Sequence, residues 1–171
     1  MITRFASLLG ALALLVTLGC DPAADVEPQV CRIPMPAIGE LGLGDKATGF
    51  IPVEPGDPVQ VVLGPQGLHM VVLSVRLEGF ELSSVGGERT RLQAAVRESG
   101  KVVAGAKDPA VKPAVVEGER VEFLGIRATF QADEVDPFNG RMADVSITVR
   151  DGCGRDIRAS DQLRLDVPSA E

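Results

Sequence analysis

The one histidine of the chain, His69, is a candidate metal ligand. It follows the turn Gly64–Gly67 and precedes Met70, and Met35 or Met142 could supply a further thioether. Copper accepts both imidazole and thioether ligands, so this pattern is compatible with a copper site. Met35 and Met142 are distant in the sequence, however. The favoured interpretation is that His69 fixes the turn through a hydrogen bond to the backbone.

A second group of possible ligands lies in the acidic segment DEVDPFNG. Asp133, Glu134, Asp136 and Asn139 could offer oxygen atoms to Ca²⁺. Their spacing does not fit an EF-hand loop, which needs D-x-[DN]-x-[DN]-G and a Glu at position 12. Asp-Pro and Asn-Gly pairs are common in turns. A solvated turn is therefore the favoured interpretation, and calcium binding is the alternative.

Three arginines, Arg89, Arg91 and Arg97, are spaced to share one face of a strand. Guanidinium groups bind carboxylates and phosphates bidentately, so an anion site is one reading. The other is that these charges cover an exposed sheet face or pair with acidic residues across it, and this reading is favoured.

Motifs of common enzymes are missing. There is no G-x-S-x-G, no P-loop, and a single histidine cannot supply H-E-x-x-H. The chain has no Trp or Tyr and a net charge of −7, which disfavours sugar-binding and nucleic-acid-binding faces. We expect a protein that is not an enzyme, holds no cofactor and binds no nucleic acid.

The first residues of the chain indicate where in the cell the protein is located. Arg4 precedes an apolar run, Phe5–Leu18, which is shorter than the ~20 residues of a membrane-spanning helix. This is the pattern of a secretory signal peptide, expected over residues 1–19. Removing Arg4 with it leaves 16 basic against 24 acidic residues, a net charge of −8.

The four residues Thr17–Cys20 resemble the lipobox of bacterial lipoproteins, although Thr17 stands where Leu is usual. The resemblance implies that Cys20 is acylated and becomes the first residue of the mature protein. Multiple acyl chains would tether it stably. The expected location is the bacterial cell envelope, on the inner or outer membrane, with the domain in the periplasm or at the cell surface. The partners implied are the membrane, through the lipid, and an envelope protein.

Two further short resemblances accompany the lipobox. Asp21, directly after the cysteine, resembles the signal that retains some lipoproteins in the inner membrane, which leaves the choice of membrane open. Gly64–His69 resembles a GPQG-x-H turn of uncharacterised lipoproteins of Gram-negative bacteria and implies no known activity.

If Cys20 is acylated, Cys31 and Cys153 remain as an even pair. An exported chain meets an oxidising compartment, so we predict a disulfide between them, with two buried free thiols as the alternative. The chain-entropy model gives about 4–5 kcal/mol for closing so long a loop. No C-x-x-C pair indicates a metal site.

Beyond the leader, apolar and polar residues alternate in short segments separated by Gly and Pro turns. The segments begin near Val59, Leu68, Thr90, Val102, Val121, Ile126, Val145 and Leu163. Seven or eight such strands predict an all-β domain, favouring an immunoglobulin-like antiparallel β-sandwich over the alternative of a small closed β-barrel. We expect residues 20–45 to form the lipidated Cys, a flexible tether and an irregular segment, and residues 46–171 to form the β-sandwich domain.

Overall fold

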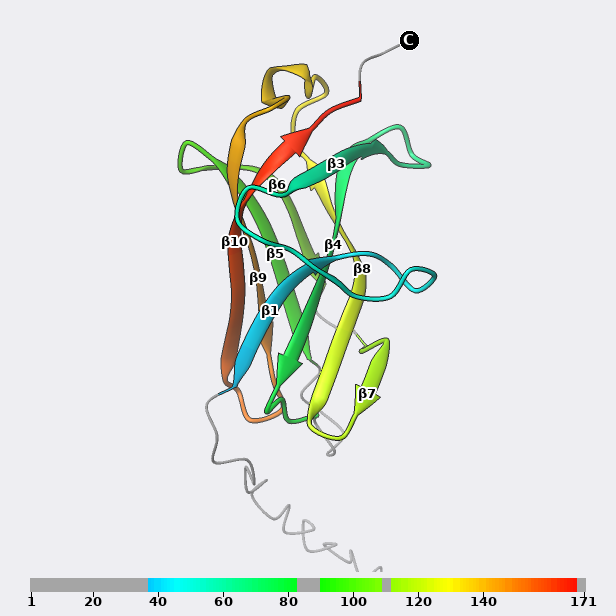
Figure 1. The fold of residues 1–171 in the computed structure, drawn as a ribbon, viewed down its shortest axis with the longest axis vertical. Coiled ribbons are helices and arrows are strands. Elements are labelled where there is room, and N and C mark those ends of the chain that lie inside the picture. Colours follow the sequence, from blue (N-terminus) through cyan, green and yellow to red (C-terminus); the bar gives the residue numbers. More distant parts are fainter. Residues whose placement is uncertain (1–36, 83–89, 109–111, 169–171) are drawn as a thin grey trace, which may run out of the picture.

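The computed structural model describes residues 37–82, 90–108 and 112–168. The described residues contain no α-helix (Figure 1). Cys20, Cys31, Met35 and Arg89 lie outside them. The elements are β1 Ile38–Leu43, β2 Ile51–Pro52, β3 Pro58–Leu63, β4 His69–Glu78, β5 Arg91–Glu98, β6 Lys101–Asp108, β7 Val115–Glu117, β8 Arg120–Phe130, the 3₁₀ turn η1 Asp136–Phe138, β9 Met142–Arg150 and β10 Asp156–Asp166.

Strand pairing closes seven of these strands into a ring in the order β4-β3-β10-β9-β5-β6-β8 and back to β4. The remaining strands extend it: β1 pairs with β4, β2 with β1, and β7 with β8. The all-β prediction is confirmed, and the closed ring is the barrel alternative. The two-sheet description is not contradicted.

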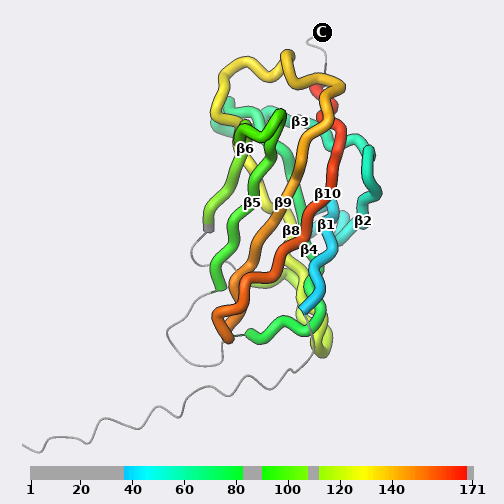
Figure 2. The backbone as a smooth tube through the Cα atoms, turned by 90° about the vertical axis from the view of Figure 1, so that its left-hand side faces the viewer, coloured from blue at the N-terminus to red at the C-terminus, as the bar shows by residue number. Residues whose placement is uncertain are grey.

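The ring is flattened into two layers. Strands β1, β4, β8 and β7 form one layer, and β10, β9, β5 and β6 form the other; Figure 2 shows β4 and β8 behind the second layer. The layers join through short pairings. On one side β3 runs parallel to β10, and on the other β6 meets β8 at only Ala104↔Phe130 and Gly105↔Thr129. Strands that are apolar on one face need such a second layer to cover that face.

The core follows the alternation read from the sequence, because successive side chains of a strand point to opposite faces. Both layers contribute side chains that have no exposed surface. These are Val61, Val71, Leu73, Val75, Leu77, Val96, Val145, Ile147, Val149, Leu163 and Leu165. Phe80 and Phe123 meet edge to face in the same core, with ring centroids 5.7 Å apart.

Gly125 forms a bulge in β8, between the apolar segments that the sequence predicts near Val121 and Ile126. Its φ is +71°, and the register with β4 shifts between Leu73 and Val75. Ser74, opposite the bulge, is fully buried although it faces outward. Its hydroxyl donates to Gly44 O at 2.8 Å and accepts from Gly125 N at 3.3 Å. The loop after β1 is thereby fixed to the bulge.

One expectation about an irregular segment differs from the structure. Residues 38–43 were expected in an irregular region, but they form β1, which pairs along β4. Glycine weakens a strand on average, yet here it permits close approach. A Cβ at Gly39 would lie 3.1 Å from Arg158 O, and one at Gly42 would clash with the Phe50 ring. The strand that begins near Val102 in the sequence continues as β6 to Asp108, although Pro109 and Pro113 in the following segment favour a loop.

We expect Leu73→Ala to lower the free energy of unfolding by about 2–5 kcal/mol, because it leaves a cavity where β4 packs against the opposite layer. The measurement is urea unfolding of the full chain. Leu63→Ala is the matched control, since Leu63 is 66% exposed and its loss should change stability by less than about 0.5 kcal/mol. Equal losses for the two variants would contradict this account of the core.

Candidate functional site

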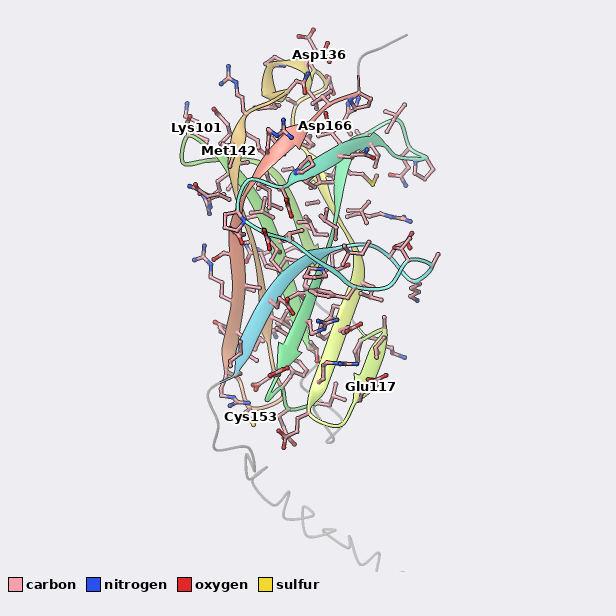
Figure 3. The ribbon with its side chains drawn as sticks, in the orientation of Figure 1. Lys101, Glu117, Asp136, Met142, Cys153 and Asp166 are labelled. Atoms are coloured by element: carbon pink, nitrogen blue, oxygen red, sulfur yellow. The ribbon has the colours of Figure 1, made fainter. Side chains whose placement is uncertain are left out.

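The loops of the barrel gather at its two opposite ends (Figure 3). We call the end with the β9–β10 turn the Cys153 end; β1 also starts there, at Ile38 (Figure 1). The other end, called the Asp136 end, gathers three connections: the β3–β4 turn at residues 64–68, the β5–β6 turn, and the loop at residues 131–141. Both loops that the sequence singles out, Gly64–His69 and Asp133–Gly140, therefore lie at the Asp136 end.

His69 and Met70 do not converge on one point. They are consecutive residues of β4, so their side chains leave opposite faces of the strand. Met70 is 8% exposed and packs against Gly64, while His69 pairs with Leu63 in the β3–β4 hairpin. Met142 starts β9, which β3 and β10 separate from β4 in the sheet. The structure therefore gives no support to the hypothesis of a copper site at His69 and Met70.

The loop at residues 133–140 is held by its apolar and amide groups, while its carboxylates are exposed. Val135 is buried, and the Phe138 ring lies 5.6 Å from that of Phe130. Asn139 Oδ1 accepts a hydrogen bond from Val167 N at 3.1 Å, which uses the amide oxygen proposed for calcium. Asp133, Glu134 and Asp136 face solvent. Within the described ranges, no three His, Cys, Asp or Glu side chains are grouped to hold a metal ion. The arrangement is that of a solvated turn.

The Cys153 end is rigidly built. Asp151 is 2% exposed, and its carboxylate accepts hydrogen bonds from Cys153 N at 2.9 Å, Arg155 N at 2.8 Å and Arg155 Nε at 2.8 Å. Arg155 in turn donates to Gly79 O at 2.8 Å. A buried carboxylate is tolerated only when paired and hydrogen-bonded in this way.

Cys153, in this turn, is disulfide-bonded. The other two cysteines of the chain, Cys20 and Cys31, lie outside the described residues. Pairing with Cys31 therefore stays a prediction.

The outer face of the β1-β4-β8-β7 layer pairs its charges internally. Arg76 bonds Glu122 at 2.9 Å and Glu40 at 3.2 Å, and its guanidinium lies 4.1 Å from the centre of the Phe50 ring. Arg120 bonds Glu117 and lies 3.9 Å from Glu122, whose side chain is 8% exposed. Arg76 and Arg120 therefore each meet at least one carboxylate, whereas Arg127, exposed on β8, has no ion pair among the described residues.

The outer face of the β10-β9-β5-β6 layer is different. Arg91 and Arg97, two of the three arginines that the sequence singles out, lie at opposite ends of β5 and are both exposed. Arg97 donates to Gly100 O at the β5–β6 turn, at 3.5 Å. Arg91 lies in a surface depression of about 420 Å³ that Lys107 and Arg150 also line. The described residues thus add Lys107 of β6 and Arg150 of β9 to Arg91, while Arg89 lies outside them.

Sequence reasoning missed Lys107, Arg150 and Asp156 as neighbours of Arg91. Only strand register brings them together: Arg91 pairs with Arg150, and Arg150 with Asp156. No spacing along the chain contains that information.

Comparison with models of protein families, with curated proteins and with solved structures finds no match for this chain. Among the described residues, none forms a helix long and apolar enough to cross a bilayer.

The Asp156 carboxylate gives a pH test of this surface. Arg150 donates to both of its oxygens at 2.8 Å, and these hydrogen bonds lower the pKa of Asp156 below its usual 3.8. A depressed pKa means that the pair stabilises the fold above pH 3.8 and that this stability is lost as the pH falls through the folded value. We expect Arg150→Gln to return the Asp156 pKa towards 3.8, as measured by NMR titration of the carboxyl carbon.

Glu98 is the matched control in the same titration, because hydrogen bonds from Arg141 and Ser99 lower its pKa independently of Arg150. Its pKa should not change in Arg150→Gln. An unchanged Asp156 pKa in that variant would show that the ion pair does not form in solution.

Proposed function

We propose that this chain is an exported, membrane-tethered lipoprotein whose β-domain is a non-catalytic binding or structural module. The lipobox-like segment Thr17–Cys20 supplies the anchor. The observation that supports the module is the division of the domain into two ends. The described chain starts near the Cys153 end, whereas the two candidate recognition loops lie at the Asp136 end. A tether at the first end leaves the second free to bind.

The surface of the Asp136 end suits a protein partner better than a polyanion. The β3–β4 hairpin exposes Leu63 at 66% and Leu68 at 45%, and Met142 is 47% exposed at the start of β9. Exposed acidic side chains, such as Asp136, accompany them. Apolar residues grouped at a hairpin tip and bordered by charge are typical of interaction surfaces. The partner class proposed is another protein of the cell envelope.

The cysteines link the anchor to the fold in a way that can be tested. The acylated cysteine of a lipoprotein has its sulfur occupied by lipid, so it cannot also form a disulfide. Because Cys153 is disulfide-bonded, acylation of Cys20 requires that Cys31 is its partner. The proposed lipid anchor on Cys20 therefore requires the predicted disulfide between Cys31 and Cys153.

We expect the full chain, produced in a Gram-negative host, to reach the membrane fraction with residues 1–19 removed and an acyl mass on Cys20. A non-reducing digest should yield a Cys31–Cys153 peptide pair that reduction separates. Cys20→Ser should abolish acylation and release from the membrane any chain that is still processed. The measurement is intact and peptide mass spectrometry of the membrane form.

Two outcomes would contradict the anchor. One is a native mass that still contains Met1. The other is a Cys20–Cys153 peptide pair, because that disulfide excludes the lipid. Cys31→Ser serves as the control: it should lose the cross-link and keep the acyl group.

The binding role is tested by site-specific photo-cross-linking in the native envelope. A photoreactive residue at Gln66 or Asp136, both exposed at the Asp136 end, should give a discrete cross-linked product. The matched control is Glu119, exposed in the β7–β8 turn near the opposite end. Products from Glu119 alone would place the contact surface at the wrong end.

A further inference from the structure

The depression beside Arg91 gathers three cationic side chains and one carboxylate. It lies on the outer face of the β10-β9-β5-β6 layer, towards the Cys153 end, and measures about 420 Å³. Its charged lining consists of Arg91, Lys107, Arg150 and Asp156, with Gln93 and Thr148 as neutral polar groups. We propose that this depression binds a phosphate group. The proposal does not depend on the lipid anchor.

Strand register shows how the side chains are arranged. One row across the sheet runs Arg91, Arg150, Asp156, because these residues pair directly from β5 to β9 to β10. The next row on the same face runs Lys107, Gln93, Thr148, Arg158 from β6 to β10, although Arg158 does not line the depression. Directly opposed residues have Cβ atoms about 4.5–5.5 Å apart, so donors from both rows face one shared space.

This arrangement is unfavourable for the fold alone. Arg91 and Arg150 stand directly opposite each other, and like charges so placed destabilise a sheet. Asp156 neutralises Arg150 through two hydrogen bonds of 2.8 Å. Arg91 and Lys107 make no ion pair with any described residue. A bound anion would relieve this repulsion.

The charge of the site selects the anion. The charged side chains that line the depression, three cationic and one carboxylate, sum to +2 among the described residues. A phosphomonoester has a charge of about −1.5 to −2 at pH 7 and three acceptor oxygens, whereas a carboxylate has a charge of about −1. Arginine binds phosphate oxygens in pairs, and Lys107, Gln93 and Thr148 add single donors. Phosphate therefore matches both the charge and the number of donors.

The primary experiment titrates inorganic phosphate into the full chain, purified in detergent, and follows Arg91 and Lys107 by NMR with calorimetry in parallel. We expect saturable binding at pH 7.5 that weakens at pH 5.5, because the phosphate dianion takes up a proton between these two pH values. Acetate should bind more weakly at both pH values. Binding should also weaken as salt is raised.

Variants assign the site. Arg91→Gln and Lys107→Gln should each weaken phosphate binding at least about tenfold, the effect typical of a hydrogen bond to a charged group. Arg97→Gln is the matched control, being an exposed arginine on the same strand and face but outside the depression. Because Arg91→Gln removes a like-charge contact, its urea-unfolding midpoint should stay the same or rise, which separates lost binding from lost folding.

The phosphate could belong to a soluble ester or to a lipid headgroup, and a competition experiment separates the two. The chain is reconstituted in phosphatidylcholine vesicles, and inorganic phosphate binding is measured with added glycerol 3-phosphate or with phosphatidic acid in the vesicles. Competition by glycerol 3-phosphate alone indicates a soluble ester, and competition by phosphatidic acid indicates a headgroup. Either result supports the phosphate site.

The proposal is overturned if phosphate binding at pH 7.5 does not saturate. It is overturned equally if Arg91→Gln and Arg97→Gln weaken binding to the same extent. A third contrary result is a lower unfolding midpoint of Arg91→Gln with unchanged phosphate affinity, which would give Arg91 a purely structural role.

Discussion

Strand β4 pairs along both of its edges, and this double pairing organises the domain. Its inward side chains, Val71, Leu73, Val75 and Leu77, are fully buried. Its backbone groups meet β1 and β3 on one edge and β8 on the other. Because one edge serves two partners in succession, the chain must turn away from the edge of β4 between β1 and β3, and β2 pairs back on β1 in this interval. The Ser74 hydroxyl fixes the start of that excursion at Gly44. With β4 fully paired and the ring closed, most of the backbone edge that could recruit another strand is removed.

Closing the ring also decides where chemistry can occur. The interior is filled by apolar side chains, so polar groups remain only on the outer faces and at the two ends. On one outer face Glu122 is nearly buried and is compensated by Arg76. On the other, Arg91 faces Arg150 with one carboxylate beside them. The whole-chain charge of −7 hides this local excess of positive charge. Net charge is therefore a poor guide to the ligands of a single face.

The alternation of apolar residues predicted the central strands well, because period-2 burial is a local property of β4, β5, β9 and β10. The Gly125 bulge could equally be predicted from the sequence, because this glycine interrupts the alternation of apolar and polar residues along β8. The strand at residues 38–43 was missed because Gly39 and Gly42 depress strand propensity. The contact that requires Gly39, with Arg158, is distant in the sequence, and the approach of the Phe50 ring to Gly42 depends on the loop between β1 and β2.

The candidate site could be predicted only in part from the sequence, because its residues are brought together by strand pairing between distant segments. Arg91 was noticed because arginines recur along β5. Its neighbours Arg150 and Lys107 depend on register across three strands. Conversely, His69 and Met70 are adjacent in the chain and suggested a ligand pair, but adjacency in a strand separates side chains to opposite faces. Sequence proximity was thus misleading for one site and insufficient for the other.

The proposed lipid tether and the proposed phosphate site both concern the Cys153 end of the domain. If Cys31 is joined to Cys153, only the segment from Cys20 to Cys31 separates the lipid from the domain, and its fully extended length is about 36–40 Å. Cys153 would then stay within that distance of the headgroups, and the depression beside Arg91 would lie further out by its own distance from Cys153. Electrostatic attraction through physiological salt decays over about 8 Å, so the disulfide shortens the tether without by itself bringing phosphate into the site. The depression also lies on the side of the barrel, so a headgroup reaches it only if the domain tilts towards the bilayer. A soluble phosphate ester needs no such tilt, and the orientation of the tethered domain therefore decides which source of phosphate the depression can use.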